Sequence, residues 1–181
     1  MSIASNWRTA SCVVAFLVLS VLVFWHPQPV RAADPDVEAL RVTIDGMYAL
    51  EEWHTDAGVF RPPQVEGRFI VLNGAVVVVL HNRIQESNQT TVASYGSYVL
   101  NSTEFSYRYE EWSVFTQTSS GITVSHKAPW EGMRSFSASR DGETVRLRSA
   151  TGEEFLFSRE GLKYSQKAKV LRVWRRIPSS Q

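Results

Sequence analysis

Two-residue turns containing glycine separate short apolar runs throughout the chain after residue 65. Asn73-Gly74 lies between the apolar runs Gly67–Leu72 and Ala75–His81. Such a pair is the strongest local signal for a β-hairpin, because both central residues of the turn take φ > 0. Asp141-Gly142 and Thr151-Gly152 repeat the arrangement further along. The pattern therefore predicts a meander of antiparallel strands.

A meander of short strands has two exposed edges, and closing it into a barrel removes both. We therefore expect an all-β fold, an antiparallel up-and-down barrel of about eight to nine strands, preceded by one short helix. A barrel of about eight strands is just wide enough either to fill with its own side chains or to hold one small molecule.

The limits of several elements follow from local signals. The helix is expected to begin with Asp34 as its N-cap and Pro35 at the first helical position, and Gly46 ends it. Met47–Trp53 is expected as the first strand and Val170–Ile177 as the last. The residues from 82 to 91 are mostly polar and are expected to form a loop.

The first 32 residues have the pattern of a secretory signal peptide. Arg8 supplies a positive charge, Cys12–Trp25 is mostly apolar, and Val30 and Ala32 occupy the third-last and last positions before a cleavage site. A retained single-span anchor is the alternative, but this apolar run is shorter than the roughly 20 residues that cross a bilayer. We expect cleavage after Ala32, which leaves residues 33–181 as one cysteine-free, periplasmic or secreted domain.

Aromatic side chains are concentrated on two strands expected to pair. Phe105, Tyr107 and Tyr109 alternate with polar residues, and then the apolar positions shift at Glu110-Glu111, which predicts a β-bulge there. The alternatives are an amphipathic wall that binds a ligand and cross-strand aromatic pairs that only stabilise the sheet. The candidate ligand-binding residues are Tyr95, Tyr98, Tyr107, Tyr109 and Trp112.

Short motifs follow one another in an order known from one group of barrels. They are Gly46-Met-Tyr48 with Trp53 nearby, Gly67-Arg-Phe-Ile70, Tyr95-Gly-Ser-Tyr98, Pro129-Trp-Glu-Gly132 and Val173-Trp-Arg175. On these residues the chain resembles the bacterial lipocalin-like domains of the calycin group, over most of residues 44–177.

This resemblance implies a barrel with one open end and a cavity for a small apolar or amphipathic ligand. Tyr48 stands where the family usually has Trp, so either Trp53 or Trp174 is expected to receive the closing-strand Arg that packs over an indole in lipocalins. Related calycin barrels also include small isomerases and other enzymes without metal centres. The fold therefore does not decide activity.

Catalytic signals in the sequence are weak. His81 shares a strand face with Val77 and Val79, which would let it point inward, as a structural histidine or as a ligand contact or proton carrier. His126 and Glu110 are the other weak candidates, with an exposed edge charge as the alternative for Glu110. The histidines are too widely spaced for a metal site, and nucleotide and hydrolase motifs are absent, so we expect neither metal nor cofactor.

The charge balance argues against nucleic acid as a partner. Without Arg8 and Arg31, the 19 basic residues become 17, against 18 acidic ones. The C-terminal segment is nevertheless basic. Its cations predict either a solvated outer face or a contact with an anionic ligand or a membrane surface. They are Arg159, Lys163, Lys167, Lys169, Arg172, Arg175 and Arg176.

These observations favour an exported lipocalin-like protein that binds a small apolar or amphipathic molecule in its barrel. A small cofactor-free enzyme, an isomerase, lyase or hydrolase, is the second hypothesis, and a filled barrel with a structural or interaction role is the third. A histidine or carboxylate within hydrogen-bond reach of a tyrosine hydroxyl in the cavity would favour the enzyme.

Overall fold

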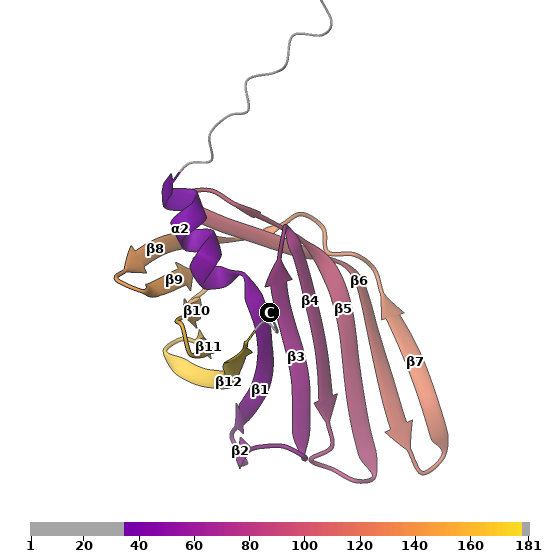
Figure 1. Ribbon diagram of the computed structural model, residues 1–181. Helices are drawn as coiled ribbons and strands as arrows, with labels where there is room; N and C mark the ends of the chain where they lie inside the picture. Colours follow the sequence, from indigo (N-terminus) through magenta and orange to yellow (C-terminus); the bar gives the residue numbers. More distant parts are fainter. Residues whose placement is uncertain (1–34, 179–181) are drawn as a thin grey trace, which may run out of the picture. The chain divides into compact units, whose positions relative to one another are not determined.

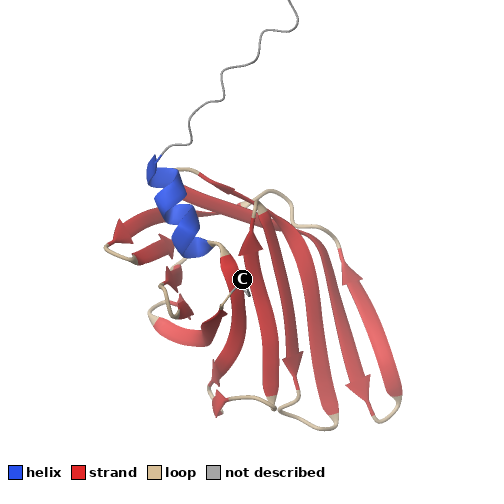
Figure 2. Cartoon of the chain, in the orientation of Figure 1, coloured by secondary structure: helices blue, strands red, loops and turns tan. Residues whose placement is uncertain are grey.

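The computed structural model describes residues 35–178, which form a closed antiparallel β-barrel with one helix (Figures 1 and 2). The expected signal peptide and the Asp34 N-cap lie outside the described residues. The elements are α2 Pro35–Ile44, β1 Gly46–Thr55, β2 Gly58–Phe60, β3 Val65–Leu72, β4 Ala75–Asn82, β5 Asn88–Leu100, β6 Glu104–Thr118, β7 Gly121–Lys127, β8 Arg134–Asp141, β9 Thr144–Arg148, β10 Glu153–Phe157, β11 Gly161–Gln166 and β12 Lys169–Ile177.

Ten of the twelve strands make the barrel, and pairing of β12 with β1 closes it. Strand β2 pairs with β1 and strand β7 with β6, both outside the closed circuit. The expected fold class is confirmed, with slightly more strands than the eight to nine expected. The sequence analysis did not identify β11, whose Gly161–Gln166 segment has few apolar residues.

The turns explain where the strands reverse. Asn73 and Gly74 have φ of 51° and 83°, as the Asn-Gly signal predicts. The second hairpin differs, because Asp141 still pairs with Thr144 and only Gly142 takes a positive φ, of 57°. Its two turn residues are thus Gly142-Glu143, with glycine in the first position.

Strand β5 begins earlier than expected. The prediction of a loop from 82 to 91 is wrong from Asn88 onward, because Asn88 pairs with Thr118 and Thr90 with Thr116 of β6. Strand β6 pairs with β8 only as far as Tyr107 and with β7 from Trp112. Polar residues suit strands at this end because β7 is an edge strand beside β6 (Figure 1), and all its residues are exposed.

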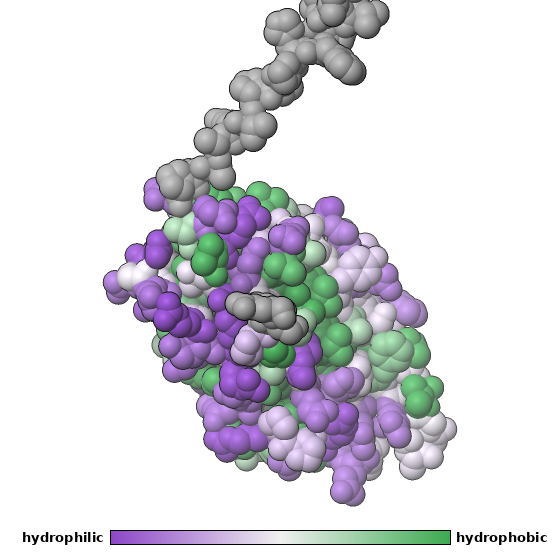
Figure 3. Space-filling model, viewed as in Figure 1, coloured by the Kyte–Doolittle hydropathy of each residue, from purple (hydrophilic) through white to green (hydrophobic). Residues whose placement is uncertain are grey.

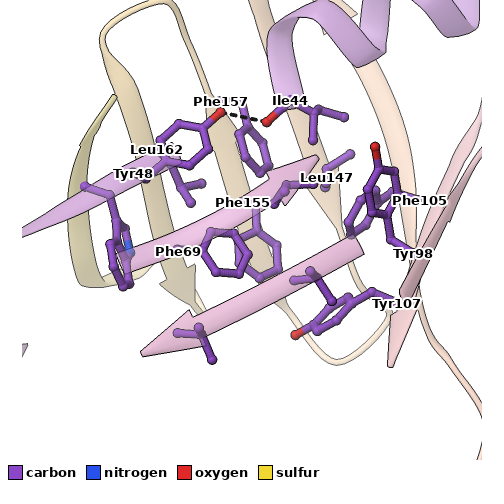
Figure 4. Close-up of a cluster of buried hydrophobic side chains, with 14 of the residues drawn as sticks. Ile44, Tyr48, Phe69, Tyr98, Phe105, Tyr107, Leu147, Phe155, Phe157 and Leu162 are labelled. Atoms are coloured by element: carbon purple, nitrogen blue, oxygen red, sulfur yellow. Dashed lines mark hydrogen bonds between the residues drawn. The ribbon is translucent and has the colours of Figure 1, made fainter. Parts of the chain in front are cut away.

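Helix α2 packs against one end of the barrel interior, and the interior is filled there. Ile44 is fully buried and its carbonyl oxygen accepts a hydrogen bond from the hydroxyl of Tyr48 at 2.7 Å (Figure 4). Phe157 lies against Tyr48 with 5.8 Å between ring centroids. Large side chains from β1, β8, β9 and β10 interlock in this half and fill the barrel interior beneath the helix.

The outer surface is largely hydrophilic on the face shown in Figure 3, with apolar patches between the polar side chains. Leu72 of β3 and Val99 of β5 are among the exposed large apolar side chains of the described residues. Alternation along the strands accounts for this, because one side chain in two points outward from a barrel wall.

Candidate functional site

A cavity of about 250 Å³ occupies the other half of the barrel interior. Its wall combines aliphatic side chains, such as Val78 and Leu80 of β4, with aromatic residues from seven different segments. Val78 and Leu80 are buried and alternate with outward-facing residues of the same strand. The cavity is therefore a direct product of strand alternation in a barrel that is only half filled.

A β-bulge in β1 turns Trp53 into the cavity. The register with β12 skips Glu51, so Leu50 faces Trp174 and Glu52 faces Val173. Before the bulge, the even-numbered residues Tyr48 and Leu50 point inward. After the bulge, the odd-numbered residue Trp53 points inward. If every residue of β1 paired in regular register, the indole of Trp53 would lie on the outer face.

A second bulge, in β6, turns Trp112 into the cavity. Tyr95 pairs with Glu111 and Gly96 with Tyr109, which leaves Glu110 unpaired, so the bulge expected at the two glutamates is confirmed. Tyr109 and Trp112 both line the cavity as a result. Gly96 lies opposite the bulge, and a Cβ atom there would come within 1.9 Å of the carbonyl oxygen of Arg108, so only glycine fits.

Three of the five candidate ligand-binding residues meet in the cavity wall. Tyr107, Tyr109 and Trp112 line it, with the ring centroids of Tyr109 and Trp112 5.7 Å apart. Tyr98 points toward the α2 end instead, where its hydroxyl donates a 2.5 Å hydrogen bond to Asp45. Tyr95 is half exposed on the outer face because it is three residues from Tyr98 on a regular strand. Ligand binding by these residues stays a prediction.

Trp130 completes the aromatic wall from a loop. This loop runs between β7 and β8, and the amide of Trp130 donates a hydrogen bond to the carbonyl oxygen of Tyr109 at 3.1 Å. The Trp130 ring lies 4.8 Å from that of Tyr109 and 5.9 Å from that of Trp112. The expected loop around Pro129–Gly132 thus supplies one side of the cavity.

Arg172 of β12 extends into this aromatic surrounding. Its guanidinium lies 4.5 Å from the ring centroid of Trp53 and 5.8 Å from that of Tyr164. Burial lowers the pKa of Arg172, but guanidinium groups stay protonated in proteins. Within residues 35–178 it forms no ion pair, and its buried Nε has no hydrogen-bond partner.

Two arginines of the closing strand pack over aromatic side chains of β1. Arg172 packs over the indole of Trp53. Arg176 lies 5.5 Å from the ring centroid of Tyr48 and donates a 3.1 Å hydrogen bond to its hydroxyl. Of the two expected indole partners, Trp53 receives an arginine and Trp174 does not. That arginine is Arg172 and not Arg175 of the Val173-Trp-Arg175 motif, which pairs with Glu51 on the outer face.

A second group of polar side chains in the cavity is internally paired. The hydroxyl of Tyr164 donates to a carboxylate oxygen of Glu153 at 2.8 Å, and Arg134 lies 3.7 Å from the same oxygen. Arg134 also stacks 3.7 Å from the ring centroid of Trp130. Burial first, and the Glu153 carboxylate second, raise the pKa of Tyr164, so its hydroxyl stays protonated.

Three buried polar atoms of the cavity wall lack a hydrogen-bond partner. They are Ser94 Oγ, Trp112 Nε1 and Arg172 Nε. Ser94 and Trp112 face each other directly across β5 and β6. A buried donor left unpaired costs about 1 to 3 kcal/mol, so such groups in a native cavity call for a ligand or ordered water.

The weak catalytic candidates lie away from the cavity. The inward orientation considered for His81 is wrong, because Val76, Val78 and Leu80 take the inward parity of β4. His81 instead lies 2.9 Å from Thr91 Oγ1. Glu110 accepts a hydrogen bond from Ser97 at 2.7 Å on the outer side of its bulge, and the ring of His126 pairs with Ser113 at 2.9 Å on the exposed strand β7.

The sequence analysis did not single out several residues of the cavity. Arg172 was counted among the basic C-terminal residues, but its two-residue spacing from the apolar Trp174 gave a usable signal that both face inward. Glu153 of β10 pairs with Gln166 of β11, and Tyr164 of β11 pairs with Phe155 of β10. Neither was a candidate, because β11 was not expected as a strand. No group of three metal-ligating side chains occurs in the described part of the chain.

Within residues 35–178, no helix has the length and apolarity needed to span a membrane. Comparisons with models of protein families, with curated proteins and with solved structures gave no match.

Proposed function

We propose that this protein is an exported, lipocalin-like carrier that binds one small apolar or amphipathic molecule in its barrel cavity. The observation that carries the proposal is the cavity itself. It occupies only the half of the barrel away from α2, and its aromatic wall contains three polar atoms without partners. Apolar surroundings with a few polar groups are typical of small-molecule sites.

Two further observations support a lipocalin-like carrier. The barrel is closed and antiparallel, and a closing-strand arginine packs over an indole of the first strand. The apolar N-terminal sequence with its small residues before Ala33 supports export to the periplasm or beyond. Most other cations of the basic C-terminal segment pair with residues of the barrel, for example Arg175 with Glu51 and Lys169 with Asp56. This pairing favours the cavity over a membrane surface as the binding region.

Calorimetric titration with a panel of small aromatic and aliphatic molecules tests the proposal. Wild-type protein should bind a member of the panel at a ratio of one to one. Val92→Trp places an indole inside the cavity and should weaken that binding at least about tenfold. Val99→Trp adds the same side chain at an exposed site of the same strand and should leave binding unchanged. Binding that survives Val92→Trp would place the ligand elsewhere and refute the proposal.

One observation favours a cofactor-free enzyme as the second candidate. Glu153 is a carboxylate in the cavity with a tyrosine hydroxyl within hydrogen-bond reach. In an isomerase, lyase or hydrolase this pair would supply a proton acceptor and a proton donor. Mass spectrometry of a ligand after incubation separates the two functions, because a carrier returns its ligand unchanged. Chemical conversion that is lost in Glu153→Gln would establish the enzyme.

A further inference from the structure

The charges inside the cavity do not cancel. Three ionised side chains line it, namely Arg172, Arg134 and Glu153. Arg134 and Glu153 lie 3.7 Å apart and neutralise each other. Arg172 has no carboxylate partner within the described residues, so the cavity carries one uncompensated positive charge.

Burying an unpaired charge is costly, and proteins normally pair or hydrate such groups. The aromatic contacts of Arg172 with Trp53 and Tyr164 hold the guanidinium in place without neutralising it. The buried Nε still lacks an acceptor. A bound group that both pairs with this atom and balances the charge must accept hydrogen bonds and carry negative charge.

We infer that the ligand of the proposed carrier is an organic carboxylate whose carboxylate group pairs with Arg172 while its apolar body lies against the aromatic wall. This inference rests on the proposed function. A carboxylate carries a single negative charge and so matches the single unpaired cation, whereas a phosphate monoester carries nearly two. Guanidinium and carboxylate also match in geometry, because two parallel hydrogen bonds can join them.

The hydroxyls around Arg172 favour the same ligand class. Tyr109 and Tyr107 line the cavity and interact electrostatically with Arg172. Burial raises the pKa of both tyrosines, that of Tyr107 to about 12, so both hydroxyls are protonated at neutral pH and can donate. The surroundings of the guanidinium thus offer donors to an anion, and the one carboxylate of the cavity lining, Glu153, is paired with Arg134 and Tyr164.

Two probes of nearly equal size test the inference by isothermal titration calorimetry. 4-Phenylbutyrate carries the carboxylate, and 4-phenylbutan-1-ol replaces it with a neutral hydroxyl. Wild-type protein should bind the carboxylate at least about tenfold more tightly, because a charge-assisted pair exceeds a neutral hydrogen bond by about that factor. This comparison needs no variant, so a folding defect cannot hide the result.

Variants then assign the preference to Arg172. Arg172→Met should remove the preference and leave binding of the alcohol within about threefold of wild type, whereas Arg172→Lys should keep part of it. Arg175→Gln is the matched control, because it removes one positive charge from the outer face of the same strand and should change nothing.

The outcomes separate this inference from the proposed function. Equal binding of the two probes by wild-type protein, or a carboxylate preference that survives in Arg172→Met, would refute the carboxylate assignment and leave a carrier of neutral molecules. Failure of wild-type protein to bind either probe or any member of the earlier panel would refute the carrier, and the carboxylate assignment with it.

Discussion

The turn between β11 and β12 places two side-chain-bearing residues in the left-handed region. Lys167 and Ala168 have φ of 48° and 64°, and they link the paired residues Gln166 and Lys169. This conformation favours glycine or asparagine at both positions, and a Cβ atom there costs about 1 to 2 kcal/mol. The closing hairpin of the barrel therefore carries local strain.

Replacing Ala168 by glycine should relieve part of that strain. We expect Ala168→Gly to raise the free energy of unfolding by about 0.5 to 1 kcal/mol, after allowance for the greater freedom of glycine in the unfolded chain. The measurement is the urea midpoint at unchanged slope. Ala75→Gly in strand β4 is the control and should lower stability by about 0.5 to 1 kcal/mol. Equal losses in the two variants would show that the turn is not strained.

Individual cavity residues were predictable only where the alternation of apolar and polar residues showed which face of the strand they occupy. Tyr107 and Tyr109 alternate cleanly with polar neighbours, and both reach the cavity wall. His81 was assigned the wrong face because Val76 to Val79 is an unbroken apolar run in which neither parity stands out. Arg172 shows the opposite case, since the charge of its segment indicated an outer face while its spacing from Trp174 places it inside.

At the scale of single elements, bulges decide which indoles reach the cavity. The extra residues Glu51 in β1 and Glu110 in β6 each reverse the parity of the strand that follows. Trp53 and Trp112 face the cavity for this reason. Both extra residues are glutamates with outer partners, Arg175 for Glu51 and Ser97 for Glu110. Bulges beside a site commonly redirect side chains in this way.

Deleting Glu110 and Glu111 together should place Trp112 next to Tyr109 along the strand and move its indole to the outer face. A shift of one residue exchanges the two faces of a strand, so Ser113 would then point into the cavity. We expect ligand affinity to fall at least about tenfold and the free energy of unfolding to fall by about 2 kcal/mol or more. Acrylamide quenching of tryptophan fluorescence should increase.

Deletion of Glu110 alone is the control. It removes only the extra residue of the bulge and leaves Trp112 two positions after Tyr109, on the same face of the strand. Ligand affinity and quenching should therefore stay close to those of the wild type. If the double deletion behaved the same way, the position of Trp112 would not follow from the alternation of the strand.

The bulge at the two glutamates was predictable because a clean alternation on one side meets a shifted alternation on the other. The bulge at Glu51 was not, because too few residues of β1 follow it to reveal a new parity. Strand β11 and the start of β5 were missed since both are polar. Backbone hydrogen bonds to neighbouring strands hold these two segments in the sheet, and such pairing leaves little trace in the local sequence.

At the scale of the whole molecule, the hairpin turns were enough to predict a closed antiparallel barrel. They were not enough to predict which half is filled. That depends on helix α2, whose Leu40 and Ile44 join the core beneath it, and on the large side chains at the same end. The position of the cavity is thus a property of the packed molecule rather than of any motif.

Burial of the tyrosines predicts how the molecule responds to alkali. All six have a raised pKa, which reaches about 12 for Tyr98 and Tyr107, chiefly because of burial; Tyr95 is the exception, where Glu111 is the main cause. Between about pH 10 and 12 the folded protein therefore binds more protons than the unfolded chain. Stability is fully present below pH 10 and should fall as the pH rises through this window.

Spectrophotometric titration of tyrosinate, followed together with circular dichroism, measures this response. Little tyrosinate should form at pH 10, the ordinary pKa of the side chain, and ionisation should accompany unfolding at higher pH. Ionisation near pH 10 of the five tyrosines other than Tyr95, with the fold intact, would show that they are not enclosed as the barrel core requires.

The central claim is that the half-filled barrel holds a small molecule. Native mass spectrometry of the wild-type protein, purified without detergent from its own compartment, tests it most directly. We predict one additional small molecule per chain, an organic acid that is released on denaturation and is missing from Val92→Trp. Recovery of the bare chain alone from wild-type protein, with no binding in the calorimetric panel, would contradict the claim.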